Sequence, residues 1–240
     1  MNQNSRLGML TPSSNTVLEP VTTAILSGLP DVTAHFGRFR VTEISLSPSA
    51  LQQFDLEPML TAAELLADAK VDVTCWNGTS AGWLGFDSDR RLCEAIGERT
   101  GIPATSSVLA LKDLFDHLGV RNFGLVSPYL DDVQAGIVQT FGAAGYRCVA
   151  ERHLGKKVNY DFAEVTEATI RDMIREVAAE RPDAVMILCT NMGGAGLAAE
   201  LEAELGCAVC DSISAAVWSS LRLAGRSPAS VQGWGRVFSV

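Results

Sequence analysis

The residues that could do chemistry lie in four polar segments, each directly after a short apolar run. The segments are PSSN at Pro12, GTS at Gly78, PYLDD at Pro128 and CTN at Cys189. Where they open helices, their free backbone N–H groups suit a small anion such as a carboxylate. A thiol in such a place can hand a proton to carbon, which makes Cys189 a candidate acid or base. Thr79, Ser80 and Tyr129 are candidate hydrogen-bond donors to such an anion.

Short apolar runs alternate with segments of helical period along the chain. The runs that predict strands are residues 7–10, 71–76, 123–127 and 184–188. Residues 166–180 place apolar side chains at helical spacing with charged residues on the other face, which predicts a helix. This alternation is typical of an α/β fold built on mostly parallel sheets.

The two halves of the chain carry three weakly matching segments in the same order. RLGMLTPS matches NFGLVSPY, VDVTCWNGT matches PDAVMILCT, and GIPATSS matches GCAVCDS. The repeat predicts two similar lobes, residues 1–115 plus 226–240 and residues 116–225. Ligands bind beyond the carboxyl ends of parallel strands, so the four polar segments would surround one cleft. In this alignment Gly78 takes the place of Cys189.

Composition and charge limit the classes of partner. Apolar residues make up 47% of the 240 residues and charged residues 20%, as in an ordinary globular protein. The formal net charge of −9, without clusters of lysine and arginine, argues against nucleic acid. Neither a signal-peptide pattern nor a run of about 18 apolar residues occurs, so we expect a cytoplasmic protein without membrane contact. The six cysteines would then be free thiols. The sequence is compatible with a homo-oligomer and with a monomer.

Five motifs give the chain a resemblance to a known group. TPSSNTVLEP at Thr11 is similar to the opening of maleate cis-trans isomerases. Four motifs are similar to arylmalonate decarboxylase: GTS at Gly78, PYLDDV at Pro128, AAVWSSLRLAG at Ala215 and GWGRVF at Gly233. Over almost its whole length the chain therefore resembles the aspartate/glutamate racemase superfamily, in the branch that contains these two enzymes.

The resemblance implies two Rossmann-like (flavodoxin-like) α/β lobes related by pseudo-twofold symmetry, with the active site in the cleft between them. It also implies an enzyme that uses no cofactor or metal and acts on a small carboxylate or dicarboxylate. Racemases of the superfamily place one cysteine from each lobe on opposite faces of the substrate. Here Gly78 stands at the position of the missing first cysteine, which is the pattern of the decarboxylase.

Several functions are compatible with these residues. A malonate-type decarboxylase needs one proton delivered to one face, which Cys189 alone could supply; this is the function we expect. A maleate isomerase needs a first-lobe nucleophile, for which the nearest thiol is Cys75, and a racemase needs a second base. A two-lobed protein that binds a small acid without transforming it is a further alternative.

The expected substrate contacts are mostly polar. By resemblance, Ser13, Ser14 and Asn15, after Pro12, look like the carboxylate clamp of the isomerase, although the same residue types also cap helices. Lys156, Lys157, Asn159 and Tyr160 fall where the decarboxylase has an apolar pocket, which favours a small diacid; Thr190 completes the set of expected contacts.

Each cysteine also has an ordinary structural interpretation. Free cysteine is among the most buried residue types, so Cys189 and, more strongly, Cys75 could be core residues. Cys207 and Cys210 form a CxxC without a second pair or a nearby histidine, and we interpret them as strand interior rather than a metal site.

Overall fold

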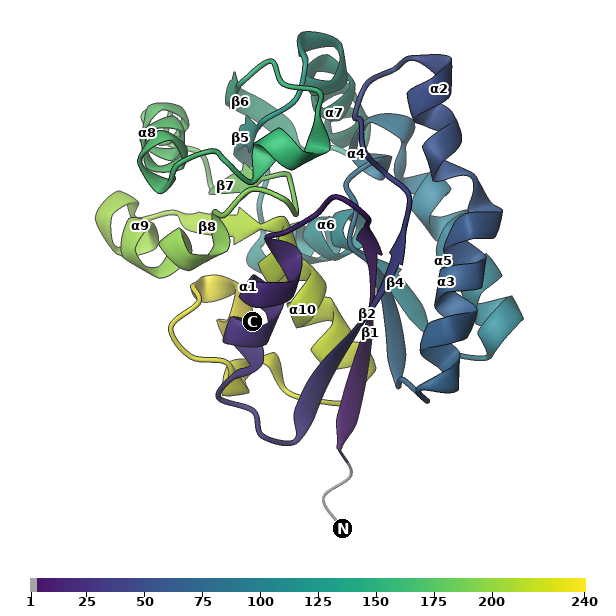
Figure 1. Cartoon of the computed structure of the whole chain (residues 1–240). Coiled ribbons are helices and arrows are strands. Elements are labelled where there is room, and N and C mark those ends of the chain that lie inside the picture. Colours follow the sequence, from purple (N-terminus) through teal and green to yellow (C-terminus); the bar gives the residue numbers. More distant parts are fainter. Residues whose placement is uncertain (1–3) are drawn as a thin grey trace.

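Two four-stranded parallel sheets form the centre of the molecule, which a computed structural model describes for residues 4–240 (Figure 1). The first sheet has the strand order β2-β1-β3-β4, and the second has the equivalent order β6-β5-β7-β8. All pairings within both sheets are parallel. The expected fold class of two similar α/β lobes is therefore confirmed.

The strands are β1 (Ser5–Pro12), β2 (Val32–Phe39), β3 (Val73–Trp76), β4 (Ala104–Ser106), β5 (Asn122–Ser127), β6 (Arg147–His153), β7 (Ala184–Ile187) and β8 (Ala208–Asp211). The α-helices are α1 (Leu18–Leu26), α2 (Pro48–Leu51), α3 (Leu56–Asp68), α4 (Ala81–Leu84), α5 (Phe86–Thr100), α6 (Ser107–Leu118), α7 (Asp131–Ala143), α8 (Glu167–Ala178), α9 (Ala198–Leu205) and α10 (Ser212–Leu223). Short 3-10 helices are η1 (Gln52–Phe54), η2 (Asn159–Phe162), η3 (Ala195–Leu197), η4 (Pro228–Ser230) and η5 (Arg236–Ser239). Across residues 4–240, no helix combines the length and apolar character needed to cross a membrane.

Burial explains why these segments form these elements. The central strands β3 and β7 are buried along their whole length, as expected for parallel strands covered on both faces. The helix α8 instead buries a single apolar face, made of Ile170, Met173, Ile174 and Val177. It begins after Thr166, whose side chain accepts a hydrogen bond from the backbone N–H of Thr169. The helix predicted for residues 166–180 is thus found at 167–178.

The matched glycines Gly8 and Gly124 have the same packing role in the two sheets. A Cβ at Gly8 would lie 3.0 Å from Cγ2 of Val71, and a Cβ at Gly124 would lie 2.9 Å from Cγ2 of Val177. Neither position has room for a side chain unless a packed valine moves. The match between the two halves of the sequence therefore reflects a shared steric demand.

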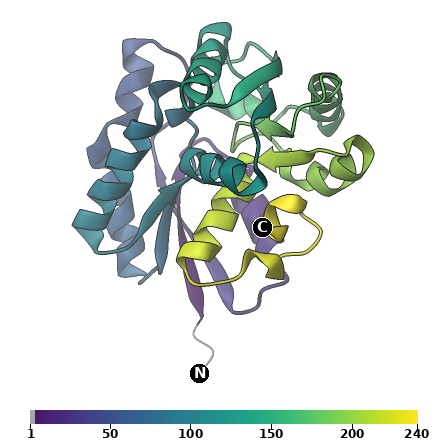
Figure 2. The ribbon, with the colours of Figure 1, turned by 180° about the vertical axis from the view of Figure 1, so that it is seen from behind.

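The helix that follows the last strand of each sheet packs against the other half of the molecule. α10 follows β8 but contacts α1 and β3. α6 follows β4, and the ring of its Phe115 packs on Phe123 and Phe141, with centroid distances of 5.7 and 6.0 Å. α6 and α10 also contact each other near the middle of the molecule (Figures 1 and 2). The two halves therefore interlock through these helices.

The C-terminal segment contacts both halves. Arg226 donates to Oγ of Ser5 at 2.8 Å and pairs with Asp31 at 2.6 Å, near the first sheet. The backbone N–H of Arg236 donates to the Glu202 carboxylate of α9 at 2.8 Å. The assignment of residues 226–240 to the first lobe, and the lobe boundaries in general, stay predictions.

We predict that Gly124→Ala destabilises the protein whereas Gly142→Ala does not. A methyl group forced against Val177 should cost about 1–3 kcal/mol. Gly142 lies in α7 with nothing within 4 Å of a new Cβ, so alanine there should stabilise by about 0.5–1 kcal/mol. Urea unfolding compares both variants with the unchanged protein, and equal stabilities would contradict the close packing of β5 against α8.

Candidate active site

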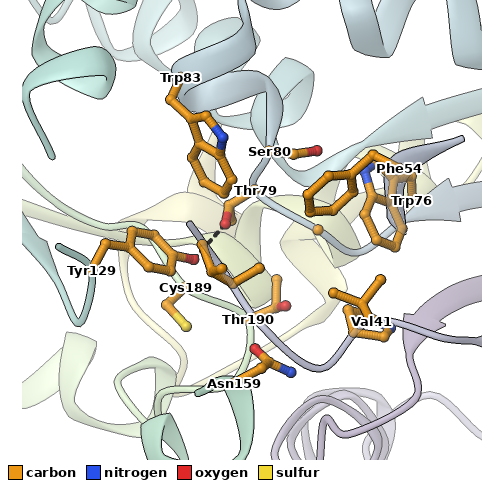
Figure 3. A pocket seen from close by; sticks show the side chains of 13 residues that line it. Val41, Phe54, Trp76, Thr79, Ser80, Trp83, Tyr129, Asn159, Cys189 and Thr190 are labelled. Atoms are coloured by element: carbon orange, nitrogen blue, oxygen red, sulfur yellow. Dashed lines mark hydrogen bonds between the residues drawn. The ribbon is translucent and has the colours of Figure 1, made fainter. Parts of the chain in front are cut away.

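A cavity lies at the carboxyl ends of the central strands and is lined by both halves of the chain (Figure 3). The space between the lining residues is about 280 Å³, part of it open to solvent. Of the residues predicted from the sequence, the lining includes Pro12, Gly78, Thr79, Ser80, Tyr129, Asn159, Cys189 and Thr190. The remaining lining residues are Val41, Ile44, Phe54, Trp76 and Trp83.

Cys189 follows β7 directly and is 1% exposed. Its backbone N–H donates to Oγ of Ser212 at 3.2 Å, which fixes the end of the strand. Burial raises the pKa of the Cys189 thiol to about 12, although hydrogen bonds from the Asn191 backbone and the Tyr129 hydroxyl act in the opposite direction. The thiol is therefore protonated at neutral pH and suited to act as an acid.

Tyr129 and Thr79 join the two halves of the chain inside the cavity. Their hydroxyl oxygens lie 2.5 Å apart in a buried hydrogen bond (Figure 3). Burial raises the pKa of Tyr129 well above its usual value, so the phenol keeps its proton. The pair thus presents neutral hydroxyl groups to the same space as the Cys189 thiol.

Backbone N–H groups add further donors at the end of β3. Those of Thr79, Ser80 and Ala81 donate to no acceptor within residues 4–240. Three successive unpaired N–H groups beside two hydroxyl side chains can hold the oxygens of an anion. This arrangement suits a carboxylate, or the enediolate formed from one.

The predicted clamp residues Ser14 and Asn15 do not line the cavity, because their polar atoms are engaged elsewhere. Oγ of Ser14 donates to the Val41 carbonyl at 2.7 Å and accepts from Nδ2 of Asn159 at 2.8 Å. Oδ1 of Asn15 accepts from the backbone N–H groups of Val17 and Leu18 and so caps the start of α1. Ser13 is exposed and exchanges hydrogen bonds with the backbone of Val41.

Asn15 instead ties the first half of the chain to the second. Its Nδ2 donates to the backbone oxygen of Thr190 at 3.0 Å and to its Oγ1 at 3.2 Å. Oγ1 of Thr190 in turn donates to the Asn77 carbonyl at 2.8 Å. These bonds fix the residue next to Cys189 against the end of β3. Direct substrate binding by Ser13, Ser14 and Asn15 stays a prediction.

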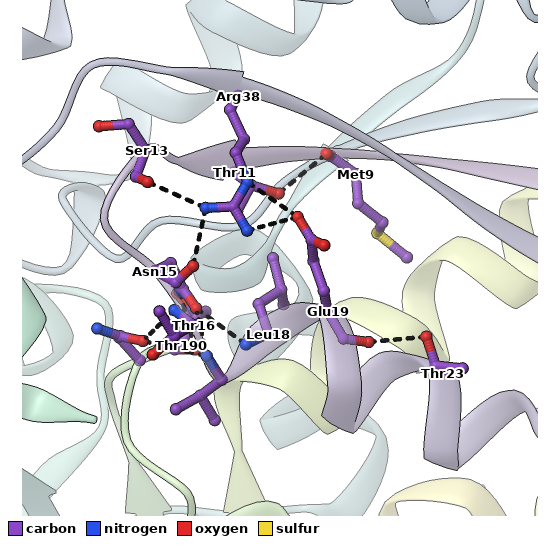
Figure 4. A network of polar contacts seen from close by, with 12 residues as sticks. Met9, Thr11, Ser13, Asn15, Thr16, Leu18, Glu19, Thr23, Arg38 and Thr190 are labelled. Atoms are coloured by element: carbon purple, nitrogen blue, oxygen red, sulfur yellow. Dashed lines mark hydrogen bonds and ion pairs between the residues drawn. The ribbon is translucent and has the colours of Figure 1, made fainter. Parts of the chain in front are cut away.

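Arg38 is a site residue that sequence reasoning missed. Its Nη1 donates to the carbonyl oxygens of Ser13 and Asn15 at 3.0 and 2.9 Å, and its other nitrogens bind the Glu19 carboxylate (Figure 4). The guanidinium therefore holds the turn after β1 in place. No strand was predicted from the sequence at β2, which carries Arg38, so no signal pointed to this role.

Cys75 faces away from the cavity. It is fully buried in β3, and burial raises the pKa of its thiol to about 12; its polar surroundings include Ser220 of α10 and Asp89 of α5. The sulfur is not part of the cavity lining. This environment is that of a core residue, and the geometry gives no support to Cys75 as the nucleophile of an isomerase.

The wall around Val41, Ile44, Phe54, Trp76 and Trp83 differs from the polar pocket expected from the sequence. Of the residues predicted there, only Asn159 lines the cavity, whereas Lys157 is exposed and Tyr160 is 53% exposed. Lys156 also lies outside the lining. The wall comes largely from the segment between β2 and α3, which carries no recognisable motif. No lysine or arginine is among the lining residues of the described chain.

Metal ligands do not gather at this cavity. Within residues 4–240, no group of three or more His, Cys, Asp or Glu side chains is placed to hold a metal ion. Cys210 is buried in β8 and Cys207 precedes that strand.

Comparisons with known proteins connect this geometry to a group of enzymes. A family model described as arylmalonate decarboxylase matches residues 17–238. Arylmalonate decarboxylase of Bordetella bronchiseptica is 26% identical over 235 residues, which cover 97% of this chain and 95% of that protein. Maleate isomerase of Pseudomonas putida is 27% identical over 251 aligned residues, which cover 100% of this chain and 99% of that protein.

The fold is also similar to solved structures. The structure of Nocardia farcinica maleate cis-trans isomerase bound to TRIS superposes with a TM-score of 0.89 at 25% identity, covering 98% of this chain and 97% of that one. The resemblance drawn from the sequence motifs is thus confirmed for the branch as a whole.

We predict that Cys189 reacts slowly with iodoacetamide at pH 7 and that its rate rises about tenfold per pH unit up to at least pH 10. The thiolate is the reactive form, and a pKa of about 12 keeps its fraction small and growing throughout this range. Mass spectrometry of the alkylated peptide follows the rate, with 2-mercaptoethanol as the reference thiol. A plateau for Cys189 below pH 9 would contradict the assignment of a protonated thiol.

Proposed function

The chain belongs to the arylmalonate decarboxylase family, and we propose that it is a cofactor-independent lyase that removes CO₂ from a substituted malonate. The observation that carries the proposal is the cavity's chemistry. Cys189 is the single thiol among its lining residues, it stands beside neutral hydroxyl donors, and the opposite wall is apolar. One thiol can deliver one proton to one face of a planar intermediate, which is all that a decarboxylation requires.

The proposed reaction balances with the groups present. The bond between the α-carbon and one carboxylate breaks, its electron pair stays on the remaining fragment, and CO₂ leaves. The resulting enediolate is held by the adjacent backbone N–H groups and by the one hydroxyl of the Thr79–Tyr129 pair that does not donate to its partner. The Cys189 thiol then gives its proton to the α-carbon. Solvent water returns a proton to the thiolate, and the hydroxide that remains is neutralised by the buffer or by the released CO₂.

The apolar wall favours decarboxylation over a reaction in which the substrate keeps both of its carboxylate charges. A carboxylate placed against Val41, Ile44 and Phe54 would lose hydration without gaining a cationic partner. Release as neutral CO₂ relieves that cost as the transition state forms. The same wall suits an alkyl or aryl substituent on the α-carbon. We therefore propose a malonate with an apolar substituent, either an alkylmalonate, which the small diacid expected from the sequence includes, or an arylmalonate.

Maleate isomerisation is the second candidate, supported by the whole-length similarity to the Pseudomonas putida enzyme. It would require a nucleophile that adds to the double bond, and Cys189 would have to take this part because Cys75 lies outside the cavity lining. Racemisation would require a second base on the other face, where the chain has Gly78. If the protein converts none of the tested acids, binding of a small acid without turnover is the remaining interpretation.

We predict that the purified protein converts methylmalonate or phenylmalonate to the monoacid in deuterated water, with one deuterium placed on the α-carbon. NMR follows the loss of substrate and the deuterium content of the product. Maleate serves in parallel, and formation of fumarate without any decarboxylation would favour the isomerase.

We predict that Cys189→Ala lowers kcat by about 10²–10⁴-fold, the usual contribution of a positioned general acid. The matched control is Cys148→Ser, a half-buried thiol of β6 outside the cavity, which should keep near-normal turnover. Circular dichroism and unfolding midpoints establish that both variants fold. A folded Cys189→Ala protein with full activity would rule out the mechanism.

We predict that Tyr129→Phe lowers kcat by about 10²–10³-fold, because a donor to the enediolate is lost. The control is Tyr160→Phe, which removes a hydroxyl from a largely exposed side chain outside the cavity. If both variants had the same kcat, Tyr129 would be a packing residue only.

A further inference from the structure

The side chain of Trp76, and not the backbone conformation, restricts position 78 to glycine. A Cβ built on Gly78 would overlap the indole carbons Cζ2, Cε2 and Cη2 of Trp76. The φ angle of Gly78 is outside the left-handed region that favours glycine. An ordinary side chain is therefore excluded there by the position of the indole, which occupies the space itself.

The indole lies where the counterpart of Cys189 would be. Residues 78 and 189 match in the repeat, and both follow the third strand of their sheet in spatial order. Trp76 is 1% exposed, packs on Phe39 with a centroid distance of 5.0 Å and lines the cavity. Cys189 and Trp76 stand at opposite sides of this cavity (Figure 3).

The indole also carries an unused donor at this place. Nε1 of Trp76 is buried and has no hydrogen-bond partner within residues 4–240. Nε1 is bonded to Cε2, one of the ring atoms that a Cβ of Gly78 would meet, so the N–H lies at the ring edge next to Gly78. A buried donor without a partner is unfavourable, and an oxygen of a bound acid would accept its hydrogen bond.

We propose that Trp76 is a specificity-determining residue that limits protonation of the intermediate to the face next to Cys189. Its ring fills the face opposite Cys189, keeps water and side chains away from it, and offers its N–H to an oxygen of the bound acid. The inference rests on the proposed decarboxylase function and adds to it the reason why the proton reaches a single face.

The steric part is tested by a thermal double-mutant cycle that needs no substrate. Gly78→Ala should lower the melting temperature by about 4–8 °C in the natural background, because the new methyl group collides with the indole. In the Trp76→Ala background the same change should cost less than half as much. Equal effects in the two backgrounds would overturn the proposal.

The stereochemical part is tested with 2-methyl-2-phenylmalonate, whose monoacid product has a stereocentre. Chiral chromatography of the product should show one dominant enantiomer for the natural protein. Trp76→Ala should reduce the enantiomer ratio at least tenfold, because water reaching the opened face can give its proton there and leave hydroxide for the buffer to neutralise. Trp76→Phe keeps a ring above Gly78, so it should preserve the dominant enantiomer while raising KM through loss of the N–H.

Trp234→Phe is the matched control, since Trp234 is partly buried and lies outside the cavity lining; its ratio and KM should be unchanged. If Trp76→Ala kept both its turnover and the enantiomer ratio of the natural protein, the inference would be overturned, whereas the proposed decarboxylase function would not be affected. If the natural protein decarboxylated no malonate, the proposed function would fail and this inference would fail with it.

Discussion

The proposed function depends on one electrostatic constraint: a small anion has to be bound in a cavity to whose lining residues 4–240 contribute no lysine or arginine. Neutral hydrogen-bond donors must therefore bind the anion. They are the Thr79–Tyr129 hydroxyl pair and the N–H groups at the end of β3. Such donors stabilise charge only when they are fixed in advance, since each has little strength when it must first reorient. The rest of the fold can be understood as the means of fixing them.

That fixation is achieved across the boundary between the two halves. Asn15 bonds Thr190, Asn159 bonds Ser14, and Thr190 bonds the Asn77 carbonyl, so the strand ends that carry the donors are tied to one another. Arg38 holds the turn from which two of these side chains project. The helices α6 and α10 contact each other and so add further contacts between the two halves. The polar residues expected to clamp the substrate thus also connect the two halves around the cavity.

The sequence predicted the parts of the molecule that recur or that carry a motif. The repeat yielded two equivalent sheets because the same steric limits act at Gly8 and Gly124, and the strand-end motifs placed Thr79, Tyr129 and Cys189 in one cavity. It could not yield the apolar wall, because Val41, Ile44 and Phe54 lie in the connection between β2 and α3, whose short helices α2 and η1 are placed by tertiary contacts. It also missed the geometry of Trp76, since strand periodicity does not reveal which way an indole at a strand end will turn.

The environment of Cys189 keeps its thiol protonated before the reaction and favours reprotonation of the thiolate after it. Burial raises the pKa of the thiol, and Asp211, whose own pKa is raised to about 7 by burial, adds repulsion when it is ionised. The carboxylate of Asp211 is fixed at the start of α10, where it accepts from the backbone N–H groups of Ile213 and Ser214. A thiolate formed by transfer to carbon would therefore be poorly stabilised. Water then restores the protonated resting form by giving a proton to the thiolate, with no further catalytic acid among the described lining residues, where Cys189 is the single thiol.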